Sequence, residues 1–457
     1  PRPFAKFGPI TNITQNGRTI SRKDVIEESV HHRAAKQQTT GEAVFTLDLP
    51  TPPHCLYGGL VMSPIPHGKI ISADYSKCLA VPGVVDVVTY KDVEGKNRVG
   101  NVIKDEPVFP EDEVQFVGHP IAMVLAKDNE TAWRAAKLAD IKFEKLHAVL
   151  DLDQAIEEKS FLPMHHKYSN ANVDEGLKKS PHVLEGVTRL GPQYHFCLEA
   201  NNCIVEPLED NKLLVTTSTQ NCTMTQNDIS ICTGLPNNNI DVRVTRIGGG
   251  FGGKETRSTV FSNYAAVAAR KVNRPVRIML DRNVDFELAG NRHPMQTHYR
   301  VGFDDDGMLI ALDAKVYSDC GWSFDISPAV TDRTLLHQES SYRIPYFSAE
   351  SFMCKVNGYS NTAFRGFGAP QGVFAMESII EHVADYLHKP VEEIRRKNLY
   401  REGDIAPFGT KLNDCLNIPS WDYIVKKFDY YNKKKEVEEF NKVNKYKKRG
   451  IAIIPLK

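Results

Sequence analysis

Residues 246–255, with the sequence RIGGGFGGKE, decide how the rest of the chain is interpreted. They join an apolar stretch at 240–247, typical of a strand, to an alanine-rich stretch at 254–271, typical of a helix. Adjacent glycines expose backbone N–H groups, and the positive end of a following helix attracts negative charge. We therefore expect this turn to hold an anionic group against the main chain.

Three interpretations of the turn follow from its own residues. Gly248, Gly250 and Gly253 satisfy the G-x-G-x-x-G pattern of dinucleotide-binding folds, but the acidic residue expected about 20 positions later is missing. The phosphate-loop pattern fits as far as Lys254 and fails at Glu255, which replaces the hydroxyl that binds magnesium. A tight strand-to-helix joint that needs glycine for close packing is the third interpretation. These residues alone leave the three open.

Other motifs share the chain with the glycine-rich run. They are STQN at 218–221, NTAFRGFGAPQG at 361–372, RRKNLYREGD at 395–404 and GHPIA at 118–122. Together with GGGFGGKETRS at 248–258, they resemble the motifs of the molybdenum hydroxylases, the xanthine dehydrogenase and aldehyde oxidase family. The second motif departs from the family's NTAFRGFGGPQG at Ala369. The resemblance extends from about residue 41 to the end of the chain.

The resemblance implies an α+β fold with two domains in series. A small hammerhead-type α/β domain is expected over residues 41–150, after a linker or arm over 1–40. A connector over 151–179 then leads to a mixed α+β molybdopterin-binding domain over 180–457. Because the apolar, strand-like run at 451–456 stops abruptly, we expect this domain to be truncated at its C-terminus and the chain to be a fragment of a longer polypeptide.

Hydrophobic patterning predicts the secondary structure of both domains. In the first domain we expect strands at 44–49, 56–62, 84–90, 114–124 and 141–144, and helices at 74–80 and 129–139. In the second we expect strands at 213–217, 240–247, 276–280, 298–301 and 309–318. Helices are expected there at 254–271, 372–387, 391–400, 421–430 and 433–445.

The resemblance also implies a chemistry. In this family a molybdenum centre on a pterin dithiolene hydroxylates a carbon next to a ring nitrogen, or an aldehyde carbon. A metal-bound hydroxide attacks, hydride passes to a sulfido ligand, and water supplies the oxygen. By motif, Gln220 would donate to a molybdenum oxygen ligand, while Gly250, Phe251 and Gly252 would present main chain to the cofactor. Arg365 would line the other side of the metal, without being a direct ligand.

Two charged residues favour a purine over an aldehyde as the substrate. Family members that oxidise xanthine hold the purine with a carboxylate and a guanidinium, and the matching positions here are Glu255 and Arg333. A carboxylate can accept from a purine ring N–H, and arginine can offset the negative charge that builds on the purine oxygen. Phe367 would stack on the flat ring. An aldehyde oxidase is the alternative function, and a surface salt bridge with Asp332 or Asp325 is the alternative role of Arg333.

Composition excludes several other classes of protein. The formal net charge is zero, which argues against nucleic acid as a partner. No apolar run approaches the roughly 20 residues that a membrane span needs. Nine cysteines with irregular spacing indicate reduced thiols, so we expect a cytoplasmic or peroxisomal protein.

The resemblance places part of the machinery outside these residues. The complete enzyme is expected to carry 2Fe-2S clusters and FAD, to pass electrons to NAD or O2, and to form a homodimer. The family's C-terminal glutamate base and a second pterin-binding loop have no counterpart here. We therefore expect this chain to be inactive alone. A non-catalytic fragment that binds a purine or a protein partner is the alternative from another class.

Overall fold

The computed structural model describes residues 12–15, 18–21 and 31–457, so most of the expected N-terminal arm lies outside the described residues. The chain divides into two compact units. One comprises residues 1–44 and 399–451, and the other comprises residues 45–398 and 452–457. The second unit contains the motifs at 118–122, 218–221, 248–258 and 361–372, and its sheets position the candidate site.

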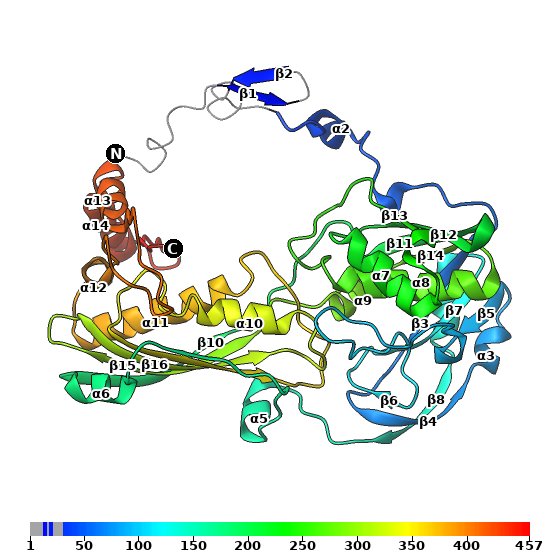
Figure 1. Ribbon diagram of the computed structural model, residues 1–457, viewed down its shortest axis with the longest axis horizontal. Coiled ribbons are helices and arrows are strands. Elements are labelled where there is room, and N and C mark those ends of the chain that lie inside the picture. Colours follow the sequence, from blue (N-terminus) through cyan, green and yellow to red (C-terminus); the bar gives the residue numbers. More distant parts are fainter. Residues whose placement is uncertain (1–11, 16–17, 22–30) are drawn as a thin grey trace. The chain divides into compact units, whose positions relative to one another are not determined.

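A seven-stranded sheet runs through both domains expected from the sequence (Figure 1). Its order is β13 (Ile240–Arg243), β12 (Lys212–Thr217), β11 (Asn202–Leu208), β14 (Val276–Met279), β3 (Leu56–Met62), β7 (Pro120–Ala126) and β5 (Val84–Val88). The two halves meet where β14 pairs in parallel with β3, with Val276 opposite Leu56. All seven residues of β7 are buried, because β3 and β5 cover its two edges and α4 packs against it.

Helices α4 (Asn129–Ala136), α7 (Cys222–Thr233) and α8 (Arg257–Val272) pack on this sheet or on each other. The start of α4 is fixed by Asp128, whose side chain accepts from the Thr131 N–H at 2.8 Å, as expected for an N-cap. The α8 helix is buried along almost its whole length because small side chains, including Ala265 and Ala268, allow close approach to the strands. This helix directly follows the glycine-rich run.

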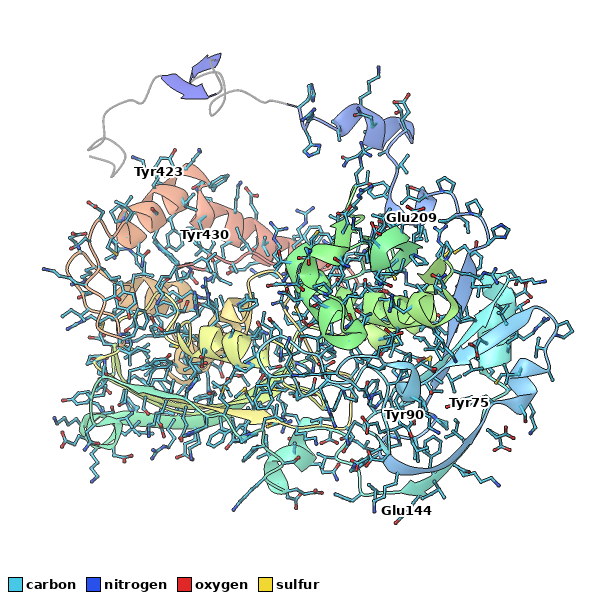
Figure 2. All side chains as sticks on the ribbon, turned by 45° about the vertical axis from the view of Figure 1, so that its right-hand side comes forward. Tyr75, Tyr90, Glu144, Glu209, Tyr423 and Tyr430 are labelled. Atoms are coloured by element: carbon cyan, nitrogen blue, oxygen red, sulfur yellow. The ribbon has the colours of Figure 1, made fainter. Side chains whose placement is uncertain are left out.

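A smaller sheet completes the first domain. It has the order β6 (Glu113–Val114), β4 (Gly68–Asp74) and β8 (Asp140–Lys145). Helix α3 (Ser76–Leu79) lies near β5. Tyr75 and Tyr90 precede and follow β5 in sequence, and Glu144 lies on β8 (Figure 2). Tyr75 packs against the small apolar cluster beneath α4, whereas Tyr90 packs against the main core.

A five-stranded sheet forms the rest of the second unit. Its order is β10 (His182–Leu190), β15 (Met295–Phe303), β16 (Leu309–Asp319), β17 (Tyr346–Cys354) and β9 (Lys167–Ser169). Helices α10 (Ser327–Leu335) and α11 (Ala369–Tyr386) cover one face, and α5 (Leu152–Glu157) and α6 (Val173–Lys179) lie on the other (Figure 1). The α12 helix (Val391–Asn398) packs on α11.

The other unit contains short elements. An antiparallel pair joins β1 (Asn12–Gln15) to β2 (Arg18–Ser21), and α2 (Ala35–Thr40) follows. Near the end of the chain, α13 (Asn417–Lys427) packs on α14 (Tyr430–Val443). These last two helices confirm the expected helical pattern and begin three to four residues earlier than their apolar stripes indicated. None of the helices in the described part of the chain is both long and apolar enough to span a bilayer.

The α+β fold class is confirmed, but three expected strands are wrong. Residues 44–49 contain a 3-10 turn, η2 (Thr46–Asp48), because buried Arg277 gathers the Leu47 and Leu49 carbonyls at 2.7 and 2.9 Å. The strand expected at 114–124 is broken, since Gly118 takes a left-handed φ of 92° between β6 and β7. Residues 451–456 pair with no strand among the described residues; the segment ends at Lys457, whose ammonium contacts buried Glu339.

Candidate functional site

The glycine-rich run forms an irregular loop between β13 and α8 instead of running directly from strand to helix. β13 ends at Arg243 and α8 begins at Arg257, three residues after the start expected at 254. The loop reverses twice, through the Gly253 N–H to the Gly250 carbonyl at 2.8 Å and the Glu255 N–H to the Gly252 carbonyl at 3.0 Å. Gly252 has a φ of 103° and Phe251, unusually for a non-glycine residue, a φ of 53°. The backbone at Phe251 is therefore strained, as is common where a loop serves a ligand.

Gln220 is held against this loop by both its main chain and its side chain. Its N–H donates to the Lys254 carbonyl at 2.8 Å. Its side-chain oxygen accepts from the Gly252 N–H at 2.9 Å and from the Lys254 N–H at 3.3 Å. The side-chain nitrogen has no acceptor among the described residues, and Gln220 is exposed. The amide is thus oriented by the loop and keeps a donor for a ligand.

The segment around Arg365 lies directly against the loop. The Arg365 N–H donates to the Phe251 carbonyl at 2.8 Å. A Cβ on Gly252 would sit 2.5 Å from the Ala363 carbonyl oxygen, so only glycine fits there. Deeper in the protein, the Thr256 and Thr362 hydroxyls are 3.0 Å apart. The structure therefore brings together three of the motifs that are far apart in sequence.

Two residues outside the motifs brace the Arg365 segment. The His195 Nε2 lies 2.7 Å from the Ala363 carbonyl oxygen, and its ring stacks on Phe364 at 4.4 Å. The guanidinium of Arg292 also lies on Phe364, 4.2 Å from the ring centroid. The same guanidinium donates to the Arg365 carbonyl at 2.8 Å. Sequence reasoning missed both residues, because neither lies in a motif and nothing in their local pattern distinguishes them. They leave the side chain of Arg365 itself exposed.

Glu255 and Arg333 both keep their charged groups unpaired within the described part of the protein. Glu255 is partly buried, and burial followed by the nearby charge of Asp325 raises the pKa of its carboxyl above the ordinary value. Arg333 lies exposed on α10 and does not form the alternative salt bridges, since Asp332 contacts His166 at 2.5 Å and Asp325 contacts Arg257 at 2.7 Å. The two residues do not touch each other, so each charge is available to a ligand.

Phe367 is partly buried, with a left-handed φ of 53°. Its N–H donates to the Phe364 carbonyl at 2.7 Å, which folds the segment back on itself. The following Gly368 is pressed against α10: a Cβ there would lie 2.1 Å from the Val330 carbonyl oxygen. This contact ties the segment that carries Phe367 to the helix that carries Arg333.

Lys254 does not behave as a phosphate-binding lysine. Its side chain is only 2% exposed, and its ammonium donates to the Glu199 carbonyl at 2.7 Å and to the Ser218 hydroxyl at 2.8 Å. A lysine of a phosphate loop must instead reach the phosphates of its ligand. The geometry therefore agrees with the failure of the phosphate-loop pattern at Glu255.

Two family models and several known proteins match this chain. The family model for the aldehyde oxidase and xanthine dehydrogenase a/b hammerhead domain matches residues 40–147, and that for the molybdopterin cofactor-binding domain matches residues 156–399. A xanthine dehydrogenase/oxidase from Gallus gallus is 43% identical over 97% of this chain and 33% of its own length. A nicotinate hydroxylase from Emericella nidulans is 42% identical over 95% of this chain and 32% of its own length.

Solved structures show the same fold. The aldehyde oxidoreductase from Desulfovibrio gigas superposes with a TM-score of 0.83 at 24% identity, over 89% of this chain and 47% of the other. Quinoline 2-oxidoreductase from Pseudomonas putida 86 gives a TM-score of 0.82 at 23% identity, over 91% and 55%. The chain spans about a third of the length of the curated relatives it matches.

Proposed function

Because the chain belongs to the xanthine dehydrogenase and aldehyde oxidase family, the molybdenum hydroxylases, we propose that it forms the hammerhead and cofactor-binding part of an enzyme that oxidises hypoxanthine and xanthine to uric acid. The observation that carries the proposal is the pair Glu255 and Arg333. Both are charged groups in the region of the motifs, and both lack a partner in the described chain. Each can therefore bind a purine without first breaking an internal ion pair.

The loop fits a molybdenum–molybdopterin cofactor. The N–H groups of Gly250 and Phe251 have no acceptor among the residues that the structure describes. The Gln220 side-chain nitrogen also has no acceptor there. A Cβ at Gly250 would lie 2.5 Å from the Gln220 side-chain oxygen and would collide with it. Glycine at this position therefore leaves the main chain of the loop uncovered. When bound, the cofactor supplies the two-electron oxidation of a ring carbon, with water as the oxygen source. Gln220, Phe251, Gly252 and Arg365 would hold it.

The substrate would lie between the loop and α10. Ionised Glu255 would accept a hydrogen bond from a purine ring N–H, and Arg333 would stabilise negative charge on the purine oxygen. Phe367 would contribute an aromatic face for the ring. Removing one such contact typically costs about 2.7–4 kcal/mol of transition-state stabilisation.

Identity alone does not choose the substrate, since the nicotinate hydroxylase is as similar as the xanthine dehydrogenases. A neutral aldehyde carries no groups that would pair with the charges of Glu255 and Arg333, which disfavours the aldehyde oxidase alternative. We further propose, from the family, that electrons leave through 2Fe-2S clusters and FAD in other domains to NAD or O2. We also propose, from the family, that the complete enzyme is a homodimer located in the cytoplasm or the peroxisome. By the same reasoning, this chain alone should be inactive.

The proposal is tested on the complete protein by comparing kcat/KM for xanthine, hypoxanthine, nicotinate and a neutral aromatic aldehyde. We expect a preference for the two purines. In Arg333→Met, purine kcat/KM should fall about 10²- to 10³-fold while aldehyde oxidation stays within about twofold. Arg189→Met, which breaks an exposed pair with Asp153, serves as the matched control and should change neither.

Other results would overturn the assignment. A wild-type protein that oxidises the aldehyde and neither purine would support the aldehyde oxidase alternative. Complete protein that contains neither molybdenum nor pterin would favour the non-catalytic binding fragment.

A further inference from the structure

We propose that the buried pair Glu199 and Lys254 positions the glycine-rich loop and Gln220 for the cofactor, so that both are positioning residues that touch neither cofactor nor substrate. The inference rests on the proposed function, because it assumes that the loop holds molybdenum–molybdopterin. It goes further by assigning a role to two charged residues that the resemblance to the family gave no role at the site.

Glu199 gathers donors from segments far apart in the sequence. Its carboxylate accepts from the Ser218 hydroxyl at 2.6 Å and from the Gly248 N–H at 2.8 Å. The Leu47 N–H and the Asn202 side chain each lie 3.2 Å away. Burial alone would raise the pKa of Glu199, but these hydrogen bonds and the charge of Lys254 outweigh it and hold the pKa below the ordinary value. The group therefore stays an anion inside the protein.

Lys254 is the cation of the pair, with its ammonium 3.7 Å from the Glu199 carboxylate. It also donates to the Glu199 carbonyl and to the Ser218 hydroxyl, so Ser218 bridges the two residues. The main chain of Lys254 both accepts from the Gln220 N–H at 2.8 Å and donates to the Gln220 side-chain oxygen at 3.3 Å. A shift of Lys254 would thus turn the Gln220 amide directly.

The two residues hold the loop at both ends. Glu199 binds Gly248 at the beginning, and Lys254 lies at the end, just before α8. The Lys254 side chain is 2% exposed and the Glu199 side chain is 5% exposed, so neither can reach a ligand. A Cβ at Gly248 would lie 2.3 Å from the Glu199 Cβ, which shows how closely the loop is seated on this residue. Among the described residues, the side-chain hydrogen bonds that the pair makes to the rest of the protein run to Gly248 of the loop, to Ser218, to Asn202 and to the Leu47 turn.

The test uses the complete, cofactor-loaded enzyme with Glu199→Gln. The matched control is Glu377→Gln, which breaks another buried ion pair, between Glu377 and Arg395 at 2.7 Å on α11 and α12. We expect both variants to lower Tm. Only Glu199→Gln should lower the molybdenum-to-protein ratio, by at least about fivefold, and change the visible circular dichroism of the cofactor that remains. Equal ratios and equal spectra in the two variants would overturn the inference.

A milder variant keeps the inference testable if Glu199→Gln does not fold. Ser218→Ala removes the hydroxyl that joins the pair, and Ser262→Ala, which removes a buried hydroxyl on α8, is its control. We expect Ser218→Ala to lower kcat at least about fivefold with KM for xanthine unchanged within twofold, because the cofactor and not the substrate is displaced. The same kcat in both serine variants would contradict the inference. Wild-type enzyme that holds molybdenum but oxidises no purine would refute the proposed substrate alone, since the molybdenum ratio needs no substrate.

Discussion

The Arg257 guanidinium holds the Glu106 carboxylate at two points, with N–O distances of 2.7 and 2.9 Å, inside the protein. Arg257 is the first residue of α8, and Glu106 belongs to the segment that matches the hammerhead family model. The same guanidinium contacts Asp325, which precedes α10, at 2.7 Å. One buried cation therefore joins the hammerhead domain, the end of the glycine-rich loop and the segment leading to Arg333.

Removing the Glu106 charge should destabilise the fold, because Arg257 is too deeply buried to regain water. We expect Glu106→Gln to lower the free energy of unfolding by about 3 kcal/mol, near the lower end of the range for a broken buried pair, since Asp325 remains. The half-exposed pair of Arg270 and Glu94 supplies the control: Glu94→Gln should cost no more than about 1 kcal/mol. Urea denaturation of both variants measures the difference, and equal losses would show that the buried contact has no special weight.

Gly252 tests the fit between the loop and the Arg365 segment. Gly252→Ala would place a Cβ 2.5 Å from the Ala363 carbonyl oxygen on a residue with a φ of 103°, so the loop must move. We expect a loss of about 1–3 kcal/mol in stability and a lower molybdenum content of the complete protein. Gly358→Ala is the control, because its Cβ meets no atom within 4 Å. Thermal denaturation and elemental analysis would read out both effects, and full molybdenum content in Gly252→Ala would argue against a cofactor at this loop.

The assembly of the motif segments into one site could be predicted from the sequence, because the resemblance to the family rests on those motifs. The structure brings the glycine-rich run together with the segments around Gln220 and Arg365. The Gly252 N–H donates to the Gln220 side chain, and the Arg365 N–H donates to the Phe251 carbonyl. Long periodic helices such as α11 were also predictable, since their apolar faces repeat over many residues.

The remainder depends on tertiary contacts that local patterns do not contain. The turn at Thr46–Asp48 replaces an expected strand because Arg277, more than 200 residues away, takes the carbonyl groups that a strand would use. Likewise, α8 begins later than its apolar pattern indicates because the Lys254 carbonyl accepts from the Gln220 N–H instead of from a main-chain N–H one turn later in the helix. His195 and Arg292 brace the site through main-chain carbonyls, and a sequence does not show which carbonyls are unpaired.

Asp319 gives a prediction for stability as a function of pH. Burial raises the pKa of its carboxyl to about 6, against an ordinary value of 3.8, although the Gly321 N–H donates to it at 2.9 Å. A raised pKa means that the folded state prefers the protonated form, so the contribution of Asp319 to stability is lost as the pH rises from about 4 to about 6. Asp319→Asn should therefore be about 1–3 kcal/mol more stable than wild type at pH 7 and equal to it near pH 4. Unfolding curves at a series of pH values test this, and a difference that does not change with pH would contradict it.

Glu255 gives the corresponding prediction for activity. Burial first, and the charge of Asp325 second, raise the pKa of Glu255 above its ordinary value of 4.5. Since the ionised carboxylate is a stronger acceptor for a purine ring N–H than the protonated acid, kcat/KM for xanthine should rise with pH through a pKa above 4.5. Glu255→Gln should remove the contribution of this group to the acidic limb and lower kcat/KM about 10- to 100-fold, because an amide oxygen is a weaker acceptor than a carboxylate. Oxidation of a neutral aldehyde by the same complete protein serves as the internal control, and its pH profile should be the same in wild type and in Glu255→Gln. An unchanged xanthine profile in Glu255→Gln would remove Glu255 from the substrate site and leave Arg333 as the only charged residue proposed to bind the purine.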